Sequence, residues 1–398
     1  MKKIIVIGAS AASIAFISKL RSFDQSSQIV CFSGEAFLPY NRCFLADFLT
    51  GDQNQTELQL KPEDFFQKNN VDLRLNTWVT SINLQKKQVC VGDASFDFDY
   101  LFLGMGCRPL VPNFLQNVRP QGVFTFHTLQ DIHQIQNYIT HYKPKSPVVV
   151  GAGLNGIEAA SSLIDLNIAV TLVEAAPMVL PGRVDQAISG WMLEKMKQKN
   201  VTVVLGQKVV DCVQENDQVQ AVILDKGAKV DADIIIIAAG SVVNSDLLEQ
   251  SGIVMVNRSV IVDNHLKTNF EYVFAAGDLC AVPDMTSKTL QRSTTWSDAM
   301  LKGLCAATNL SENPRAYPGY VGLQDSYFFE VDFYACGQTT GFQAPVQVVQ
   351  KIQDECAQAF YIQNDCLIGF VLIGDSLKLA EYKMWYMTKK LVSASDFN

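Results

Sequence analysis

Residues 147–156, PVVVGAGLNG, decide the fold of this chain. The apolar run at 147–150 is typical of a strand that is buried on both faces. Gly151, Gly153 and Gly156 follow it, and apolar residues at helical spacing come next. Glycines placed between a strand and a helix allow a tight turn and a close approach of the backbone to a pyrophosphate. This stretch therefore predicts a nucleotide-binding βαβ unit rather than a glycine-rich turn without a ligand.

An acidic residue completes this unit. The strand predicted at 170–173 ends at Glu174, 18 residues after Gly156. A carboxylate at the end of the second strand hydrogen-bonds the ribose 2′-hydroxyl of a dinucleotide, and it would repel a 2′-phosphate. We therefore expect NADH, with NADPH as the less favoured nucleotide.

The same order of elements occurs at the N-terminus. The run KIIVI at 3–7 predicts a strand, residues 11–22 a helix, and 29–33 a second strand. The turn between the first strand and the helix keeps one glycine, and its candidate ligand-binding residues are Gly8, Ser10 and Ser13. Glu35 is the acid near the end of the second strand, with an exposed loop carboxylate as the alternative interpretation. Two βαβ openings about 140 residues apart predict two Rossmann-like domains.

Residues 313–398 are predicted to form a small third domain. Residues 313–320, NPRAYPGY, read as a linker because they contain two prolines and a glycine. The segments after it mix apolar strands with a final helix near 375–390, which is typical of a small α+β domain.

Composition excludes several functional classes. The chain has 398 residues and a net charge of −8, which gives no overall attraction to nucleic acid or to an anionic membrane. No apolar stretch reaches the roughly 18 residues of a spanning helix. The apolar run at 3–7 is too short for a secretory signal, so we expect a cytoplasmic protein. The ten cysteines form no C-x-x-C pair and no metal-ligand spacing with histidine, so no metal site is predicted.

Five segments in order resemble the pyridine-nucleotide-dependent flavoprotein reductases of glutathione-reductase type. They are residues 8–13, 98–109, 151–160, 234–244 and 268–278. Met105 stands where that family usually has threonine, and Val243 stands where it has proline. The resemblance implies an α/β fold with two Rossmann-like domains and a small α+β C-terminal domain. The FAD-binding domain would comprise 1–112 and 241–312, the NAD-binding domain 113–240 and the C-terminal domain 313–398.

The resemblance also implies the cofactor-binding residues. Those for FAD are Gly8, Ser10, Ser13, Glu35, Arg42, Gly104, Arg108, Gly277, Asp278 and Trp296. Those for NADH are Gly151, Gly153, Gly156, Glu174 and Gly240. Asp278 would hold the ribityl chain, and Trp296 would cover the flavin unless it is an ordinary core tryptophan. Glu158 would line the nicotinamide pocket, unless it only complements the dipole of its helix.

Two further segments, 38–45 and 365–375, resemble rubredoxin and ferredoxin reductases and the flavin domain of assimilatory nitrite reductases. Many of these relatives have a lysine at the position of Asp47. The implied chemistry is electron transfer that starts with a hydride passing from NADH to the flavin, with the protein orienting both cofactors.

Three fates of the electrons remain open. The first is a small electron-carrier protein such as rubredoxin or ferredoxin, for which Lys383, Lys389 and Lys390 are candidate contacts or simply a solvated helix face. The second is NADH oxidase, peroxidase or CoA-disulfide reductase chemistry through Cys43, although Ala11 stands where such relatives have histidine. A packing role for Cys43 is the alternative. The third is a non-catalytic, NADH-responsive flavoprotein. Monomer and homodimer both remain possible.

Overall fold

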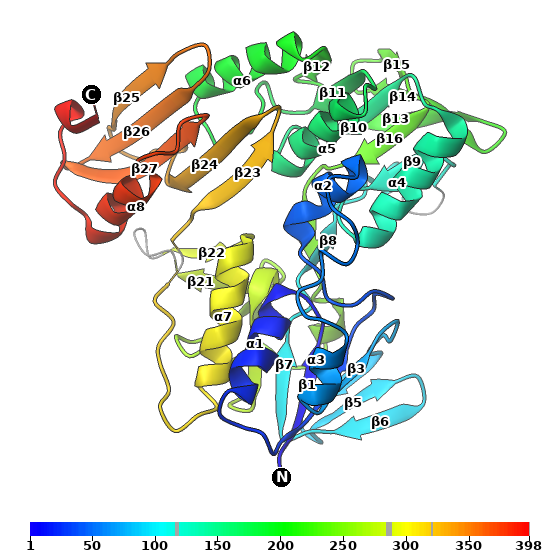
Figure 1. Cartoon of the computed structure of the whole chain (residues 1–398), viewed down its shortest axis with the longest axis vertical. Coiled ribbons are helices and arrows are strands. Elements are labelled where there is room, and N and C mark those ends of the chain that lie inside the picture. The colour runs from blue at the N-terminus through cyan, green and yellow to red at the C-terminus, as the bar shows by residue number, and fades with distance from the viewer. Residues whose placement is uncertain (116–118, 284–288, 320, 398) are drawn as a thin grey trace. The chain divides into compact units, whose positions relative to one another are not determined.

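The computed structural model describes residues 1–115, 119–283, 289–319 and 321–397. The chain divides into two units, each made of several segments. Unit 1 comprises residues 1–44, 54–108 and 242–320, and unit 2 comprises residues 45–53, 109–241 and 321–398. Each unit is built around its own parallel sheet, and Figure 1 shows both.

The centre of unit 1 is a five-stranded parallel sheet. Its strands, in spatial order, are β20 (Val273–Ala275), β7 (Tyr100–Leu103), β1 (Lys3–Ile7), β2 (Gln28–Phe32) and β3 (Val71–Arg74). β1 to β2 is the βαβ unit predicted from the sequence. The three central strands β7, β1 and β2 are mainly apolar and buried, whereas the edge strand β3 contains Asp72 and Arg74 and is largely half-buried or exposed. All their carboxyl ends meet at one edge, which is where parallel sheets bind ligands.

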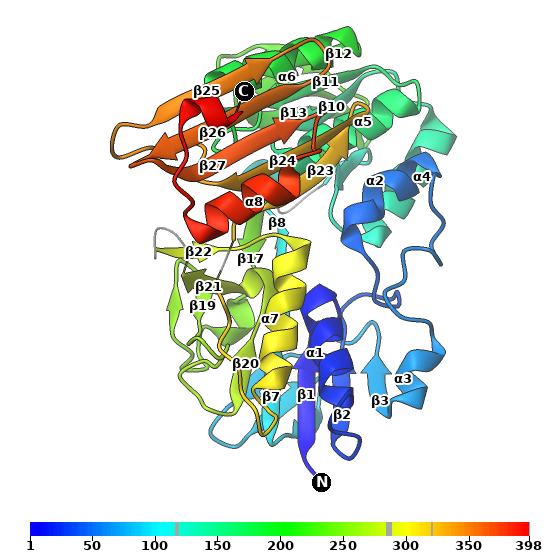
Figure 2. The ribbon, with the colours of Figure 1, turned by 60° about the vertical axis from the view of Figure 1, so that its left-hand side comes forward.

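Two helices of unit 1, α1 (Ala11–Arg21) and α7 (Trp296–Thr308), lie side by side (Figure 2). A Cβ on Gly303 would lie 2.1 Å from the carbonyl oxygen of Ala12, so glycine permits this close approach. The smaller elements of the unit surround the sheet. They are α3 (Asp64–Lys68), η1 (Arg42–Phe44), η3 (Asp246–Leu248), η4 (Gly277–Leu279), the sheet β4 (Ser81–Asn83), β5 (Gln88–Val91) and β6 (Ala94–Asp97), and the sheet β18 (Met255–Val256), β19 (Ser259–Ile261), β21 (Cys280–Pro283) and β22 (Leu290–Arg292).

Unit 2 contains a second five-stranded parallel sheet. Its strands, in spatial order, are β12 (Val201–Leu205), β11 (Val170–Glu174), β10 (Pro147–Val150), β16 (Ile234–Ile237) and β9 (Val123–Thr125). The predicted strand–turn–helix–strand order is present as β10, α5 (Leu154–Asp165) and β11. The other elements are α4 (Leu129–Tyr142), α6 (Gln186–Gln198), η2 (Asn113–Leu115), and the antiparallel sheet β13 (Val209–Glu215), β14 (Gln218–Leu224) and β15 (Lys229–Asp231). β8 (Cys107–Pro109) pairs with β17 (Ser241–Val243).

The C-terminal part of unit 2 has the predicted α+β character. An antiparallel sheet of five strands carries α8 (Leu379–Thr388), which is slightly shorter than the helix predicted at 375–390, and η5 (Ala394–Phe397). The strands, in spatial order, are β23 (Gln324–Phe328), β24 (Val331–Gly337), β27 (Cys366–Ile373), β26 (Ala357–Gln363) and β25 (Gln347–Ile352). Phe360, Phe370, Tyr382 and Phe397 form much of its core.

The division into units differs from the domains predicted from the sequence: residues 109–112 fall in unit 2 and 313–320 in unit 1, and two larger differences have a visible cause. Residues 321–398 group with the second parallel sheet rather than alone, since Trp191 Nε1 donates to Gln353 O at 2.7 Å. The short helix α2 (Leu45–Thr50) groups with unit 2 because it packs against α4, where Gln136 Nε2 donates to Phe48 O at 2.7 Å. Nothing in the local sequence of α2 marks this change of unit.

Candidate functional site

The first βα turn has the backbone geometry of a phosphate-binding turn. Gly8 has φ +94°, and a Cβ at this position would lie 2.3 Å from the carbonyl oxygen of Gly104. α1 begins at Ala11, and the side chain of its N-cap Ser10 makes no capping hydrogen bond. The first amides of α1 are therefore directed outward at the carboxyl edge of the sheet, where they can bind an anion. The turn keeps this geometry with one glycine instead of three.

Ser13 supplies a second sign that unit 1 accommodates a polar group. Its hydroxyl is buried and has no hydrogen-bond partner within the described residues. Gly104 lies beside it, and a Cβ on Gly104 would be 2.2 Å from the Ser13 oxygen. A buried hydroxyl without a partner is unfavourable. The residues of this turn therefore fit the predicted pyrophosphate of FAD.

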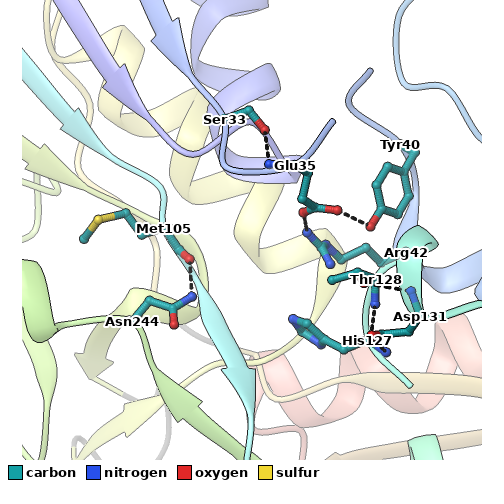
Figure 3. Close-up of polar contacts among 9 residues, drawn as sticks. All are labelled: Ser33, Glu35, Tyr40, Arg42, Met105, His127, Thr128, Asp131 and Asn244. Atoms are coloured by element: carbon teal, nitrogen blue, oxygen red, sulfur yellow. Dashed lines mark hydrogen bonds and ion pairs between the residues drawn. The ribbon is translucent and has the colours of Figure 1, made fainter. Parts of the chain in front are cut away.

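Glu35 is held by two neighbours from the segment that follows β2. Tyr40 donates its hydroxyl hydrogen to Glu35 Oε2 at 2.6 Å, and Arg42 forms an ion pair with Glu35 Oε1 (Figure 3). The guanidinium of Arg42 also lies 5.2 Å from the centre of the Tyr40 ring. The Glu35 side chain is 28% exposed, so the alternative interpretation as an exposed loop carboxylate is wrong. No short sequence pattern marks the contact between Tyr40 and Glu35, so the sequence alone does not predict it.

Asp278 lies in η4, near the N-terminal part of α1. Gly277, directly before it, has φ +74°, and a Cβ there would be 3.4 Å from the Cβ of Ala12. Cys107 donates its thiol hydrogen to Asp278 Oδ2 at 3.4 Å. Burial raises the pKa of the Asp278 carboxyl, whereas the hydrogen bond from Cys107 and the positive charge of Lys302 act in the opposite direction. Asp278 is thus a partly desolvated acceptor suited to the hydroxyls of a ribityl chain.

Arg108 and Trp296, the other predicted FAD contacts, have different surroundings. Trp296 is the first residue of α7 and is half-buried against the core of unit 1. Arg108 is exposed and bonds within its own unit to Asp246 at 2.7 Å and to the side-chain oxygen of Asn244 at 3.0 Å. Asn244 in turn donates to the carbonyl oxygen of Met105 at 2.9 Å (Figure 3). These contacts give Arg108 a role in joining two segments, while a contact with FAD stays a prediction.

The glycine turn of unit 2 satisfies the three requirements of a dinucleotide-binding turn. Gly151 has φ +108°, and a Cβ there would lie 2.4 Å from the carbonyl oxygen of Ala238. A Cβ on Gly156 would lie 1.9 Å from the carbonyl oxygen of Gly151, so α5 packs tightly on β10. Gly153 is the N-cap of α5, and a Cβ there would meet nothing within 4 Å. The open side at Gly153 is where a pyrophosphate can approach.

Glu174 lies at the end of β11 and closes this turn. Its Oε2 accepts from the backbone N–H of Ala152 at 2.7 Å, and its Oε1 accepts from that of Ala176 at 2.7 Å. Gly240, the remaining predicted NADH contact, has φ +108°, and its carbonyl oxygen accepts from Leu110 N at 2.9 Å. Contacts of Glu174 and Gly240 with a nucleotide stay predictions.

Glu158 in unit 2 has a pKa well above that of an ordinary glutamate. It is half-buried on α5, and Ser326 at β23 donates its hydroxyl hydrogen to Glu158 Oε1. Burial raises the pKa of Glu158 to about 7, and the negative charges of Asp47 on α2 and Asp325 on β23 act in the same direction. The first turn of α5 contains no acidic residue, so the interpretation of Glu158 as a simple dipole-complementing acid is wrong. The sequence did not reveal Ser326, which is 168 residues away.

Cys43 lies in η1 and is exposed. Its backbone N–H donates to the Asn41 side-chain oxygen at 3.0 Å. The packing role expected for this cysteine is therefore wrong. Its thiol is accessible, and its participation in redox chemistry stays a prediction.

Two further features are absent from the described part of the chain. No three histidine, cysteine, aspartate or glutamate side chains gather there in a way that could hold a metal ion. Among the same residues, no helix is long and apolar enough to cross a membrane.

Three similar known sequences are all NAD(+)- or NAD(P)H-dependent reductases by name. The Rubredoxin-NAD(+) reductase of Pseudomonas putida is 27% identical over 311 residues, covering 77% of this chain and 79% of the relative. The 3-phenylpropionate/cinnamic acid dioxygenase ferredoxin–NAD(+) reductase component of Photorhabdus laumondii is 26% identical over 383 residues, covering 94% and 93%. The Nitrite reductase [NAD(P)H] of Bacillus subtilis is 25% identical over 378 residues, covering 94% of this chain and 46% of that longer protein.

Among solved structures, putidaredoxin reductase in its covalent complex with putidaredoxin has the same fold. It superposes with a TM-score of 0.92 at 22% identity, covering 99% of this chain and 95% of that one. The family model for pyridine nucleotide-disulphide oxidoreductases matches residues 2–303. These matches confirm the predicted fold class, the oxidoreductase activity, and FAD and NADH as cofactors. The chain belongs to the pyridine nucleotide-disulphide oxidoreductase family.

Proposed function

We propose that this protein oxidises NADH through its flavin and passes the electrons to a small one-electron carrier protein such as a rubredoxin or a ferredoxin. The observation that carries this proposal is the match with a ferredoxin–NAD(+) reductase component over 94% of this chain and 93% of that relative. When bound, the flavin supplies the chemistry, because it accepts a hydride and can release the two electrons one at a time.

The residues of each unit have separate tasks in this function. In unit 1, the amides at the start of α1 and the hydroxyl of Ser13 bind the pyrophosphate of FAD, and Asp278 accepts from its ribityl hydroxyls. In unit 2, the amides that follow Gly153 bind the pyrophosphate of NADH, and Glu174 binds its adenosine ribose. Glu158 lines the pocket of the nicotinamide.

The surface at α8 supports a carrier protein as the electron acceptor. Residues 378–390 contain four lysines and one glutamate, although the whole chain has a net charge of −8. Met384, Met387 and Leu391 are exposed beside these lysines. Exposed apolar side chains close in sequence to several lysines suit an acidic redox partner, since charge complementarity steers the encounter.

The first experiment is an anaerobic titration of the purified protein with NADH, followed at the visible flavin band. We expect one equivalent of NADH to bleach one flavin completely. Steady-state turnover is then compared for rubredoxin, a [2Fe–2S] ferredoxin, oxygen and CoA disulfide. Fast reduction of one carrier, weakened by salt and by Lys383→Glu with Lys389→Glu, supports the proposal. Equal, slow rates with every acceptor would overturn it and favour the non-catalytic flavoprotein.

Cys43 supports a second candidate function, because its thiol is exposed in η1 directly after Arg42. In this alternative the protein is an NADH oxidase, peroxidase or CoA-disulfide reductase, and the Cys43 thiolate attacks the peroxide or the disulfide. The titration distinguishes the two functions. Uptake of two equivalents of NADH, reduced to one by Cys43→Ser, would favour this alternative.

A further inference from the structure

A large aromatic side chain in unit 1 has no role in the function described so far. Trp78 follows β3 and is 72% exposed, although tryptophan is usually well buried. β3 runs parallel to β2, so the segment after it lies at the same carboxyl edge of the sheet as the first βα turn. An exposed tryptophan at that edge is placed where parallel sheets bind their ligands.

The indole of Trp78 lies directly over the backbone of Gly34. A Cβ at Gly34 would be 2.5 Å from both Cε2 and Cζ2 of the indole, so a side chain there would clash with the ring in its present position. The backbone on either side is fixed by two hydrogen bonds, from Thr77 N to Ser33 O at 2.7 Å and from Asn76 N to Glu35 O at 2.9 Å. The ring is thus supported from below by the turn that follows β2, while its other face is open to solvent.

Glu35 is the residue that gives this arrangement a ligand. It directly follows Gly34, and it is the acid at the end of β2 that is expected to bind the adenosine ribose of FAD. The base attached to that ribose must extend past Glu35, away from the pyrophosphate at α1. Purine rings stack readily on an indole, because both present a π-face and both have little conformational freedom to lose.

We propose that Trp78, seated on Gly34, is the stacking platform for the adenine of FAD. This inference rests on the proposed assignment of FAD to unit 1, and it adds a residue that selects FAD over flavins without adenine. Glycine at position 34 is then required for the position of the ring. No φ in the left-handed region accounts for this glycine.

The test compares FAD with FMN, which has the flavin and a phosphate but no adenine. Apoprotein is titrated with each, and dissociation constants are obtained from flavin fluorescence. We expect Trp78→Ala to weaken FAD binding about tenfold, the loss typical of one stacked base, and to leave FMN binding unchanged. Trp78→Phe should recover most of the affinity. ADP should quench the fluorescence of Trp78, obtained as the difference between the wild-type protein and Trp78→Phe.

Gly34→Ala is the independent variant. Its methyl group displaces the indole, and because the ring is exposed it can swing into solvent without disturbing the core. We expect the same loss of FAD affinity as for Trp78→Ala, and no additional loss in the double variant, since both act through one contact. Phe23→Ala is the matched control, because Phe23 is an exposed aromatic residue of the same unit just beyond the C-terminal end of α1.

The outcomes separate this inference from the function on which it rests. A wild-type protein that binds no FAD would overturn both. If the wild-type protein binds FAD and Trp78→Ala binds it equally well, only the platform is overturned. A parallel loss of FAD and FMN binding in Trp78→Ala would also overturn it, because the ring would then support the turn rather than the adenine.

Discussion

Ser326 donates a hydrogen bond to the carboxylate of Glu158, and the two residues come from segments 168 positions apart in the chain. The hydroxyl stabilises the charged form of Glu158, but burial outweighs it and raises the pKa to about 7. Glu158 therefore changes charge within the physiological range, where an ordinary glutamate is fully ionised. Its protonation state is expected to matter for a bound dinucleotide, which is itself an anion.

The affinity for NADH is predicted to decrease as the pH rises through about 7, because Glu158 then gains a negative charge near the nucleotide site. Glu158→Gln keeps the shape of the protonated side chain and should remove this pH dependence. The dissociation constant for NADH, measured anaerobically from pH 5.5 to 8.5, tests this prediction. The same dependence in wild-type and variant proteins would show that another group titrates.

The free energy of unfolding is also predicted to depend on pH through Glu158. The pKa of Glu158 is higher in the folded protein, at about 7, than in an unfolded chain, at about 4.3. The folded state therefore binds more protons between these pH values, and the contribution of Glu158 to the free energy of unfolding falls as the pH rises from about 4 to about 7. Urea unfolding of wild-type and Glu158→Gln proteins across that range gives the free energy of unfolding at each pH. It should fall less steeply with rising pH in the variant.

The charge of Asp47 is predicted to shift the pKa of Glu158. Its negative charge adds to the effect of burial on Glu158, and α2 places it there. Asp47→Asn should lower the pKa of Glu158, and Asp47→Lys should lower it further, as the charge nearby becomes zero and then positive. The midpoint of the pH profile for NADH binding measures this shift. Glu194→Gln, which neutralises an exposed acid on α6, is the control and should leave the midpoint unchanged.

A buried ion pair on α7 is predicted to control the stability of unit 1. Lys302 is fully buried, its Nζ lies 2.9 Å from Asp298 Oδ2, and Tyr317 donates a hydrogen bond to the other oxygen of Asp298. Lys302→Met leaves the Asp298 charge buried and uncompensated, which should reduce the free energy of unfolding by about 3–5 kcal/mol. The double variant with Asp298→Asn should lose less. Urea unfolding compares the three proteins, and a double variant less stable than Lys302→Met would refute this account.

Two glycines of the second turn are predicted to respond differently to the same substitution. Gly153→Ala meets no neighbour, so the fold should be retained, but its methyl group stands on the side open to the pyrophosphate. We expect weaker NADH binding at unchanged thermal stability. Gly156→Ala would bring a Cβ to 1.9 Å from Gly151 O and should lower the melting temperature itself. Equal melting temperatures for the two variants would contradict this distinction.

These examples show which parts of the structure the sequence could predict. The two βα turns were predictable because the need for glycine between a strand and a helix is local and leaves a pattern. Contacts between distant segments leave none. The bond from Ser326 to Glu158, the position of Trp78 over Gly34, and the transfer of α2 to unit 2 all depend on how the chain returns to itself. Cys43 shows the same limit, since its exposure in η1 depends on the fold around it and not on its own residue type.

Glu174 is predicted to set the preference for NADH over NADPH. Glu174 accepts backbone hydrogen bonds through both carboxylate oxygens, so its substitution affects the turn as well as the nucleotide. Glu174→Gln removes the charge that would repel a 2′-phosphate, and Glu174→Arg reverses it. We expect the ratio of kcat/KM for NADPH to that for NADH to rise in the order wild type, Gln, Arg, by about tenfold overall. The melting temperature separates the two effects, because damage to the turn lowers it and weakens both nucleotides equally. A constant ratio with a lowered melting temperature would mean that Glu174 only supports the turn.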